Sequence, residues 1–209
     1  MNTGTISDAT AAFGALPRGH FAAIYADPPW RYEVWSGETA VKARLNGKGT
    51  NVAAGHHYNT MSFEELMALP VADVAAKDCV LFCWVTWPTL VRALDMIDAW
   101  GFTYKTCAFD WTKAHAGQIE LFQDDVSGQM GMGHWTRANT EACLLATRGK
   151  PKRQNADVRQ AIIEPRREHS RKPDCVYGRI ERLVAGPYLE MFARSARPGW
   201  SAWGNQVGK

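Results

Sequence analysis

The sequence lacks the features of membrane, secreted and disulfide-stabilised proteins. Its longest apolar stretches, such as residues 79–85, are far shorter than the ~20 residues that a membrane-spanning helix needs. Its N-terminus does not resemble a signal peptide, and its 5 cysteines are an odd number at scattered positions. We therefore expect a cytoplasmic protein with reduced thiols.

Common cofactor and metal motifs are also missing. No Gly-x-Gly-x-x-Gly follows an apolar strand and no Gly-x-x-x-x-Gly-Lys-Ser/Thr occurs, so dinucleotide and nucleoside-triphosphate binding lose their main sequence support. The 6 histidines and the cysteines show no metal-ligand spacing, and we expect no metal site.

The net positive charge is small, but basic residues are unevenly distributed. The net charge is only +3, yet residues 148–153 and 166–172 form two basic clusters. Local positive potential attracts phosphate groups, whereas solvated loops with ordinary lysines and arginines are the alternative interpretation of each cluster.

The size and the hydrophobic pattern indicate one α/β domain over residues 1–209. Hydrophobic residues make up 46% of the chain and charged residues 22%, which is typical of a globular protein. Short apolar runs separated by helical patterns favour a largely parallel sheet. The strands that we expect are residues 22–26, 79–85, 106–111, 142–147, 161–164, 188–192 and 201–203.

Three helices have recognisable ends. Ser62 and Glu65 predict a capping box that opens a helix through residue 69, and Pro88 precedes a helix at 89–100 that stops at Gly101. Asp174 is expected to cap a helix at 175–184. Two long segments interrupt this alternation, at about 31–60 and 112–138, and we expect both to form loops that face the substrate.

One tetrapeptide, Asp27-Pro28-Pro29-Trp30, directly follows an apolar strand pattern and carries distinctive chemistry. The Asp27 carboxylate and a Pro28 carbonyl with no nearby amide proton are two acceptors, the number that an exocyclic amine of a nucleobase requires. Trp30 is then expected to cover or stack on the base. The alternative is a simple turn, because proline ends a central strand.

Further motifs along the chain make the sequence similar to one known family. They are Asp27-Pro28-Pro29-Trp30, His57-Tyr58-Asn59-Thr60-Met61-Ser62, Phe82-Cys83-Trp84-Val85-Thr86, Gly133-His134-Trp135 with Glu141, Ser170-Arg171-Lys172-Pro173-Asp174, Leu189-Glu190-Met191-Phe192-Ala193-Arg194, Gly199-Trp200 and Gly204-Asn205-Gln206. In this set the chain resembles the MT-A70 family of adenine-N6 methyltransferases. The resemblance implies a Rossmann-like methyltransferase sheet in which the catalytic motif precedes the cofactor motif, a permuted order.

The resemblance also implies S-adenosylmethionine as cofactor and assigns roles to individual residues. The catalytic motif is Asp27, Pro28, Pro29 and Trp30. Lys172 is expected to pair with the methionine carboxylate of the cofactor. Asp27 is expected to bind the cofactor as well. The remaining cofactor-binding residues implied by the resemblance are Glu190, Arg194, Asn205 and Gln206. Those expected to bind the substrate are Tyr58, Trp135, Glu141, Ser170 and Arg171.

The function expected from these residues is methyl transfer to the N6 amine of adenine in nucleic acid, with DNA preferred because the chain is a compact catalytic unit. RNA, a small amine substrate and a non-catalytic nucleic-acid-binding subunit are the alternatives. A homodimer or a heterodimer with a related chain is a further expectation.

Overall fold

The structure, a computed structural model, describes residues 13–30, 60–114, 135–136, 138–165, 167 and 171–204. Within them, seven strands form one sheet in the order β5-β3-β4-β2-β1-β6-β7. The strands are β1 (Phe21–Ala26), β2 (Ala75–Val85), β3 (Thr103–Ala114), β4 (Thr140–Arg148), β5 (Ala161–Pro165), β6 (Tyr188–Met191) and β7 (Trp200–Trp203). Each strand expected from the apolar runs is confirmed.

The strand directions confirm a mixed α/β fold of the Rossmann-like kind. β1 runs parallel to β2 and β6, β6 to β7, and β3 to β5. β4 is antiparallel to both of its neighbours, β2 and β3. Six of the seven described strands therefore end at one edge of the sheet, which we call the carboxyl edge, and β4 begins there.

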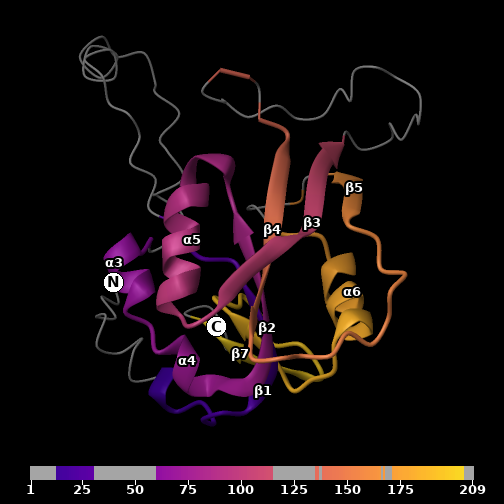
Figure 1. Cartoon of the computed structure of the whole chain (residues 1–209). Helices are drawn as coiled ribbons and strands as arrows, with labels where there is room; N and C mark the ends of the chain where they lie inside the picture. The colour runs from indigo at the N-terminus through magenta and orange to yellow at the C-terminus, as the bar shows by residue number, and fades with distance from the viewer. Residues whose placement is uncertain are drawn as a thin grey trace, which may run out of the picture.

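Helices cover both faces of this sheet (Figure 1). α3 (Phe63–Met67), α4 (Val71–Val74) and α5 (Leu90–Ala99) pack on one face, and α6 (Cys175–Leu183) packs on the other. Side chains of successive strand residues alternate between the two faces, so Ile24 lies in the α5-side core and Tyr25 in the α6-side core.

Two of the expected helix boundaries are confirmed. Ser62 and Glu65 form the capping box, with the Glu65 N–H donating to Ser62 Oγ at 3.2 Å and the Ser62 N–H donating to the Glu65 carboxylate at 2.6 Å. Gly101 ends α5 with a φ of +80°, a left-handed conformation that glycine adopts without strain. A short 3₁₀ turn, η2 (Trp87–Thr89), precedes α5.

The expected loop at 112–138 begins too early and needs correction. β3 continues through Ala114, because residues Asp110 to Ala114 pair with the whole of β5. β2 likewise starts at Ala75, and α4 was not expected at all. Polar or short segments joined to the sheet by backbone pairing do not produce an apolar run that the sequence would reveal.

All five cysteines lie among the described residues and are free. Burial raises the pKa of the Cys79 thiol to about 12, and Cys83 and Cys143 are fully buried with pKa values raised by the same cause. In the described part of the chain, no helix combines the length and the apolar character required to cross a membrane.

Candidate active site

Asp27 directly follows β1, in the interior of the sheet, where β2 and β6 flank its strand. The two prolines after it form a fixed turn. The Met61 N–H donates to the Pro29 carbonyl at 3.0 Å, and Trp30 and Met61 form an isolated parallel bridge. The turn is therefore anchored to the segment that leads into α3.

The Pro28 carbonyl differs from the expectation. It was predicted to have no amide proton near it, but the Trp30 N–H donates to it at 2.9 Å across a tight turn. A carbonyl oxygen has two lone pairs, so this acceptor keeps one of them for a further donor.

Trp30 is packed into the core. Its side chain is only 6% exposed, and its ring centroid lies 5.2 Å from that of Phe63 in α3. A ring buried to this extent has little open face, so stacking of Trp30 on a base stays a prediction that requires the ring to move.

Lys172 lies between two carboxylates at the carboxyl edge. Its Nζ is 2.8 and 2.9 Å from the two oxygens of Asp27 and 3.3 Å from Glu141 Oε2, and Lys113 pairs with the other Glu141 oxygen. The side chains of Lys172, Glu141 and Lys113 are less than one-fifth exposed. We call Asp27, Lys172, Glu141 and Lys113 the charge cluster.

Four separate elements bring the charge cluster together. Asp27 follows β1, Glu141 is the second residue of β4, Lys113 is near the end of β3, and Lys172 precedes α6. Because β4 runs against its neighbours, its start lies beside the ends of β2 and β3, at the same edge of the sheet as the end of β1. This reversed strand direction is what places Glu141 beside Lys172.

Neighbouring charges in the cluster stabilise the ionised forms of Lys172 and Glu141. Burial alone would lower the pKa of Lys172, but Asp27 and Glu141 outweigh it and raise that pKa above its ordinary value. Burial alone would raise the pKa of Glu141, but Lys172 and Lys113 outweigh it and leave that pKa below its ordinary value. Lys172 is therefore cationic, and Glu141 anionic, at neutral pH.

Indole rings lie under both lysines. Lys172 Nζ is 5.6 Å from the ring centroid of Trp84, and Lys113 Nζ is 5.3 Å from that of Trp111. The Trp84 Nε1–H donates to the buried hydroxyl of Tyr25 at 2.7 Å, which fixes this ring from below. Both ammonium groups therefore lie over indole rings, and a hydrogen bond fixes the ring of Trp84.

A second group lies on the other side of Asp27. The Tyr177 hydroxyl donates to Glu190 Oε1 at 2.9 Å, and the Arg197 guanidinium lies 4.2 Å from the Tyr177 ring centroid. Burial raises the pKa of Glu190, the charge of Asp27 adds to this rise, and the hydrogen bond from Tyr177 opposes it. Glu190 is the β6 residue in register with Tyr25 of β1.

The other predicted site residues differ in their surroundings. Arg194 follows β6 and is partly buried, whereas Trp135 is 94% exposed. Arg171 is mostly exposed and binds both oxygens of Asp174, at 2.9 and 3.1 Å. Four predicted residues lie outside the described part of the chain: Tyr58, Ser170, Asn205 and Gln206.

The prediction that Asp174 caps α6 is wrong. Its side chain accepts no hydrogen bond from the described backbone of this helix and instead pairs with Arg167 and Arg171. Two guanidinium groups are stronger partners for a carboxylate than a single amide, which explains the difference.

Sequence reasoning missed three residues of the site: Lys113, Tyr177 and Arg197. For Lys113 a signal was present, because strand alternation puts it on the same face as Trp111, but the expected strand ended too early to use it. Tyr177 and Arg197 carried no signal, because their partners are distant in the sequence.

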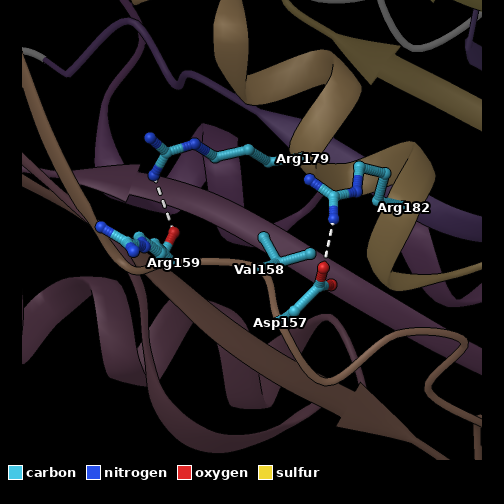
Figure 2. Close-up of a pocket in the computed structure, with 5 residues that line it drawn as sticks. All are labelled: Asp157, Val158, Arg159, Arg179 and Arg182. Atoms are coloured by element: carbon cyan, nitrogen blue, oxygen red, sulfur yellow. Dashed lines mark hydrogen bonds and ion pairs between the residues drawn. The ribbon is translucent and has the colours of Figure 1, made fainter.

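A separate hollow of about 410 Å³ lies at the other end of α6 (Figure 2). It is lined by Asp157, Val158, Arg159, Arg179 and Arg182. Arg179 donates to the backbone carbonyls of Arg159 and Ala161, and Arg182 pairs with Asp157. These bonds fasten the β4–β5 connection to α6. In the described residues, no group of three or more metal-binding side chains occurs here or elsewhere.

Comparison with known proteins gives this site its family. The profile of the MT-A70 family matches residues 21–206, which include the whole charge cluster. The chain belongs to the MT-A70 family. It is therefore a methyltransferase of that family, and the resemblance noted from its motifs is confirmed.

Individual relatives agree with this assignment. The type II methyltransferase M.MunI of Mycoplasma sp is 33% identical over 203 residues, which cover 93% of this MT-A70 chain and 81% of that protein. The N(6)-adenosine-methyltransferase MT-A70-like protein of Drosophila melanogaster is 30% identical, and the catalytic subunit METTL3 of Homo sapiens 28%. Each match covers 90% of this chain but only 27% and 28%, respectively, of those longer proteins.

Proposed function

We propose that this MT-A70 protein acts as one S-adenosylmethionine-dependent methyltransferase domain that modifies the N6 amine of adenine in DNA, in the cytoplasm. The observation that carries the proposal is the Asp27 carboxylate, which lies at the carboxyl edge beside a proline carbonyl and is bound by the buried Lys172. The family, the strand order and the chemistry of the neighbouring side chains support it.

The sheet order divides the site into two sides. Glu190 and Arg194 belong to β6 and the turn after it, and Asn205 and Gln206 follow β7 in sequence. β2 and β4 lie on the opposite side of β1. We therefore assign the cofactor to the β6 side of Asp27 and the amine acceptor to the β2 and β4 side.

The donor groups fit the proposed cofactor. Lys172 offers a cation to the methionine carboxylate, while Asp27 and Glu190 offer carboxylates to the methionine ammonium. When bound, S-adenosylmethionine supplies an already activated methyl group, so the protein contributes alignment and electrostatics rather than covalent chemistry.

Asp27 and Pro28 then act on the amine itself. The carboxylate and the free lone pair of the Pro28 carbonyl accept the two N–H bonds, which directs the nitrogen lone pair towards the cofactor side. Positive charge develops on the nitrogen during transfer, and the fixed Asp27 carboxylate stabilises it. The amine proton then leaves to Asp27 or to water.

DNA is proposed as the polymer because the type II methyltransferase is more similar to this chain, at 33% identity, than the N(6)-adenosine-methyltransferases, at 30% and 28%. RNA is the second candidate. The names of the latter relatives favour it, since they refer to adenosine.

The test is transfer of labelled methyl groups from S-adenosylmethionine to duplex DNA, single-stranded DNA and RNA, with products digested to nucleosides. We expect label in N6-methyladenine from DNA and a loss of about 100- to 1,000-fold in Asp27→Asn, as for other fixed electrostatic groups in active sites. Asp157→Asn, a carboxylate at the far end of α6, is the matched control and should retain full activity.

Three results would contradict the proposal in different ways. Label in RNA alone would mean that RNA, not DNA, is the substrate, and absence of label from every polynucleotide would contradict a nucleic-acid substrate. Full activity of Asp27→Asn would remove Asp27 from the mechanism.

A further inference from the structure

We propose that Trp87 is the stacking surface for a nucleobase that flanks the target adenine. This inference rests on the proposed function, because it assumes a polynucleotide substrate. It adds a substrate-binding residue on the acceptor side of the site, outside every motif that led to the family.

Trp87 lies close to the charge cluster. It starts η2, two residues after the end of β2, and β2 is the strand next to β1 on the acceptor side. Its Nε1–H donates to Thr140 Oγ1 at 2.9 Å, and Thr140 directly precedes Glu141. The hydrogen-bond partner of the indole therefore directly precedes the residue whose carboxylate binds Lys172.

The alternation of strand side chains separates Trp87 from the target position. Thr140 and Glu141 are successive residues of β4, so their side chains project to opposite faces. Glu141 meets Lys172 on the α6 side, whereas Thr140 and Trp87 lie on the α5 side. A base held at Asp27 would therefore have Trp87 beside it rather than over it, which is the place of a neighbouring base.

The turn that carries Trp87 is rigid. The Thr89 hydroxyl donates to the Thr86 carbonyl at 2.9 Å and accepts from the Thr86 N–H at 3.3 Å, while Pro88 restricts the backbone between them. An aromatic ring on a fixed turn loses little conformational entropy when a ligand covers it.

The exposure of Trp87 contrasts with that of three other tryptophans near the charge cluster. Trp87 is 50% exposed, whereas Trp30, Trp84 and Trp111 are 6%, 1% and 1% exposed. Single exposed apolar side chains are common on proteins. Here, however, a hydrogen bond fixes the polar end of the indole at the edge of the site and leaves half of the side chain open.

The first test measures the steady-state kinetics of Trp87→Ala and Trp87→Phe with duplex DNA. Loss of one base–aromatic stack is worth about 1–3 kcal/mol, so we expect KM for DNA to rise about 5- to 160-fold in Trp87→Ala, with kcat and cofactor affinity little changed. Trp87→Phe should restore most of the affinity. Val91→Ala, at a 73% exposed position of α5, is the control.

The second test needs no turnover. Random-sequence DNA in which 5-iodouracil replaces thymine is irradiated with the wild-type protein, and cross-linked peptides are identified by mass spectrometry. We expect the peptide that contains Trp87 to be cross-linked. If the wild-type protein methylates no polynucleotide, the proposed function fails and this cross-link decides the role of Trp87 separately.

An unchanged KM for DNA in Trp87→Ala, or cross-links that avoid its peptide, would overturn the inference. Light scattering covers the remaining alternative. If Trp87→Ala converts an oligomer into a monomer, Trp87 contacts a second protein chain instead, and the inference is again overturned.

Discussion

Two groups of charged side chains lie at opposite ends of α6 and use the same chemistry under different conditions. In the charge cluster, the side chains of Lys172 and Glu141 are 11% and 14% exposed. In the hollow shown in Figure 2, the paired side chains of Arg182 and Asp157 are 58% and 67% exposed. Lys172 and Glu141 are largely shielded from water, whereas Arg182 and Asp157 are mostly exposed to it.

The difference in burial separates the proposed site from a group of surface ion pairs. Burying charges carries a desolvation cost that a pair recovers only with several good partners, so a buried lysine between two carboxylates is weak evidence for a purely stabilising role. Exposed pairs are weak, and those of the hollow bind their own loop to α6. A hollow of about 410 Å³ therefore does not by itself mark the active site.

The strongest test of this contrast is Lys172→Met, which keeps the length of the side chain but removes its charge. Asp27 and Glu141 lose their shared cation, and we expect the free energy of unfolding to fall by about 2–4 kcal/mol. That range lies below the value for fully buried pairs because Asp27 is 29% exposed. Chemical denaturation at pH 7 measures it.

Lys105→Met is the matched control, because Lys105 is exposed at the start of β3. Its unfolding free energy should change by less than about 0.5 kcal/mol. Equal effects of the two substitutions would mean that burial does not distinguish Lys172.

A second test uses the pH dependence of Glu141→Gln. The pKa of Glu141 in the folded protein lies below its ordinary value of 4.5, so folding favours the ionised form. The stabilisation is complete above pH 4.5 and is lost as the pH falls through the pKa of Glu141 in the folded protein. We expect the free energy of unfolding of the wild type to exceed that of Glu141→Gln by about 1–3 kcal/mol at pH 7. This difference should decrease as the pH falls.

Denaturation curves of both proteins between pH 3 and pH 7 check this prediction, with Asp95→Asn on the exposed surface of α5 as control. A difference that stays constant down to the lowest pH would show that Glu141 does not titrate below its ordinary range.

The smallest effect is expected at the hollow. Arg182→Ala removes an exposed pair, so the free energy of unfolding should fall by no more than about 1 kcal/mol, and added salt should reduce the difference. Methyl transfer should be unchanged. A large loss of DNA binding in this variant would instead make the hollow a phosphate site and weaken the contrast with the charge cluster.

Much of the fold was readable from the sequence because buried strands leave apolar runs. β1, β2 and β4 each carry such a run, and the capping box of Ser62 is local in the chain. The proposed catalytic motif is equally local, since Asp27 and the prolines are adjacent and follow a strand. These features depend on neighbours within a few residues.

Features that depend on distant neighbours could not be predicted. An apolar run does not reveal the direction in which its strand runs in the sheet. The antiparallel direction of β4, which brings Glu141 to the carboxyl edge, therefore could not be predicted. The partner of Lys113 is separated from it by 28 residues, and the burial of Trp30 depends on contact with α3. Asp174 occupies a sequence position typical of a helix cap, but its carboxylate pairs with two arginines, Arg167 and Arg171.

The free cysteines have a practical consequence for experiments on this protein. The thiolate is the reactive form of cysteine, and every one of the five has its pKa raised in the fold, chiefly by burial. Alkylating reagents at neutral pH will therefore react slowly with the native protein and quickly with opened molecules. The rate at which the native cysteines are alkylated therefore reports the opening of the fold, without an engineered probe.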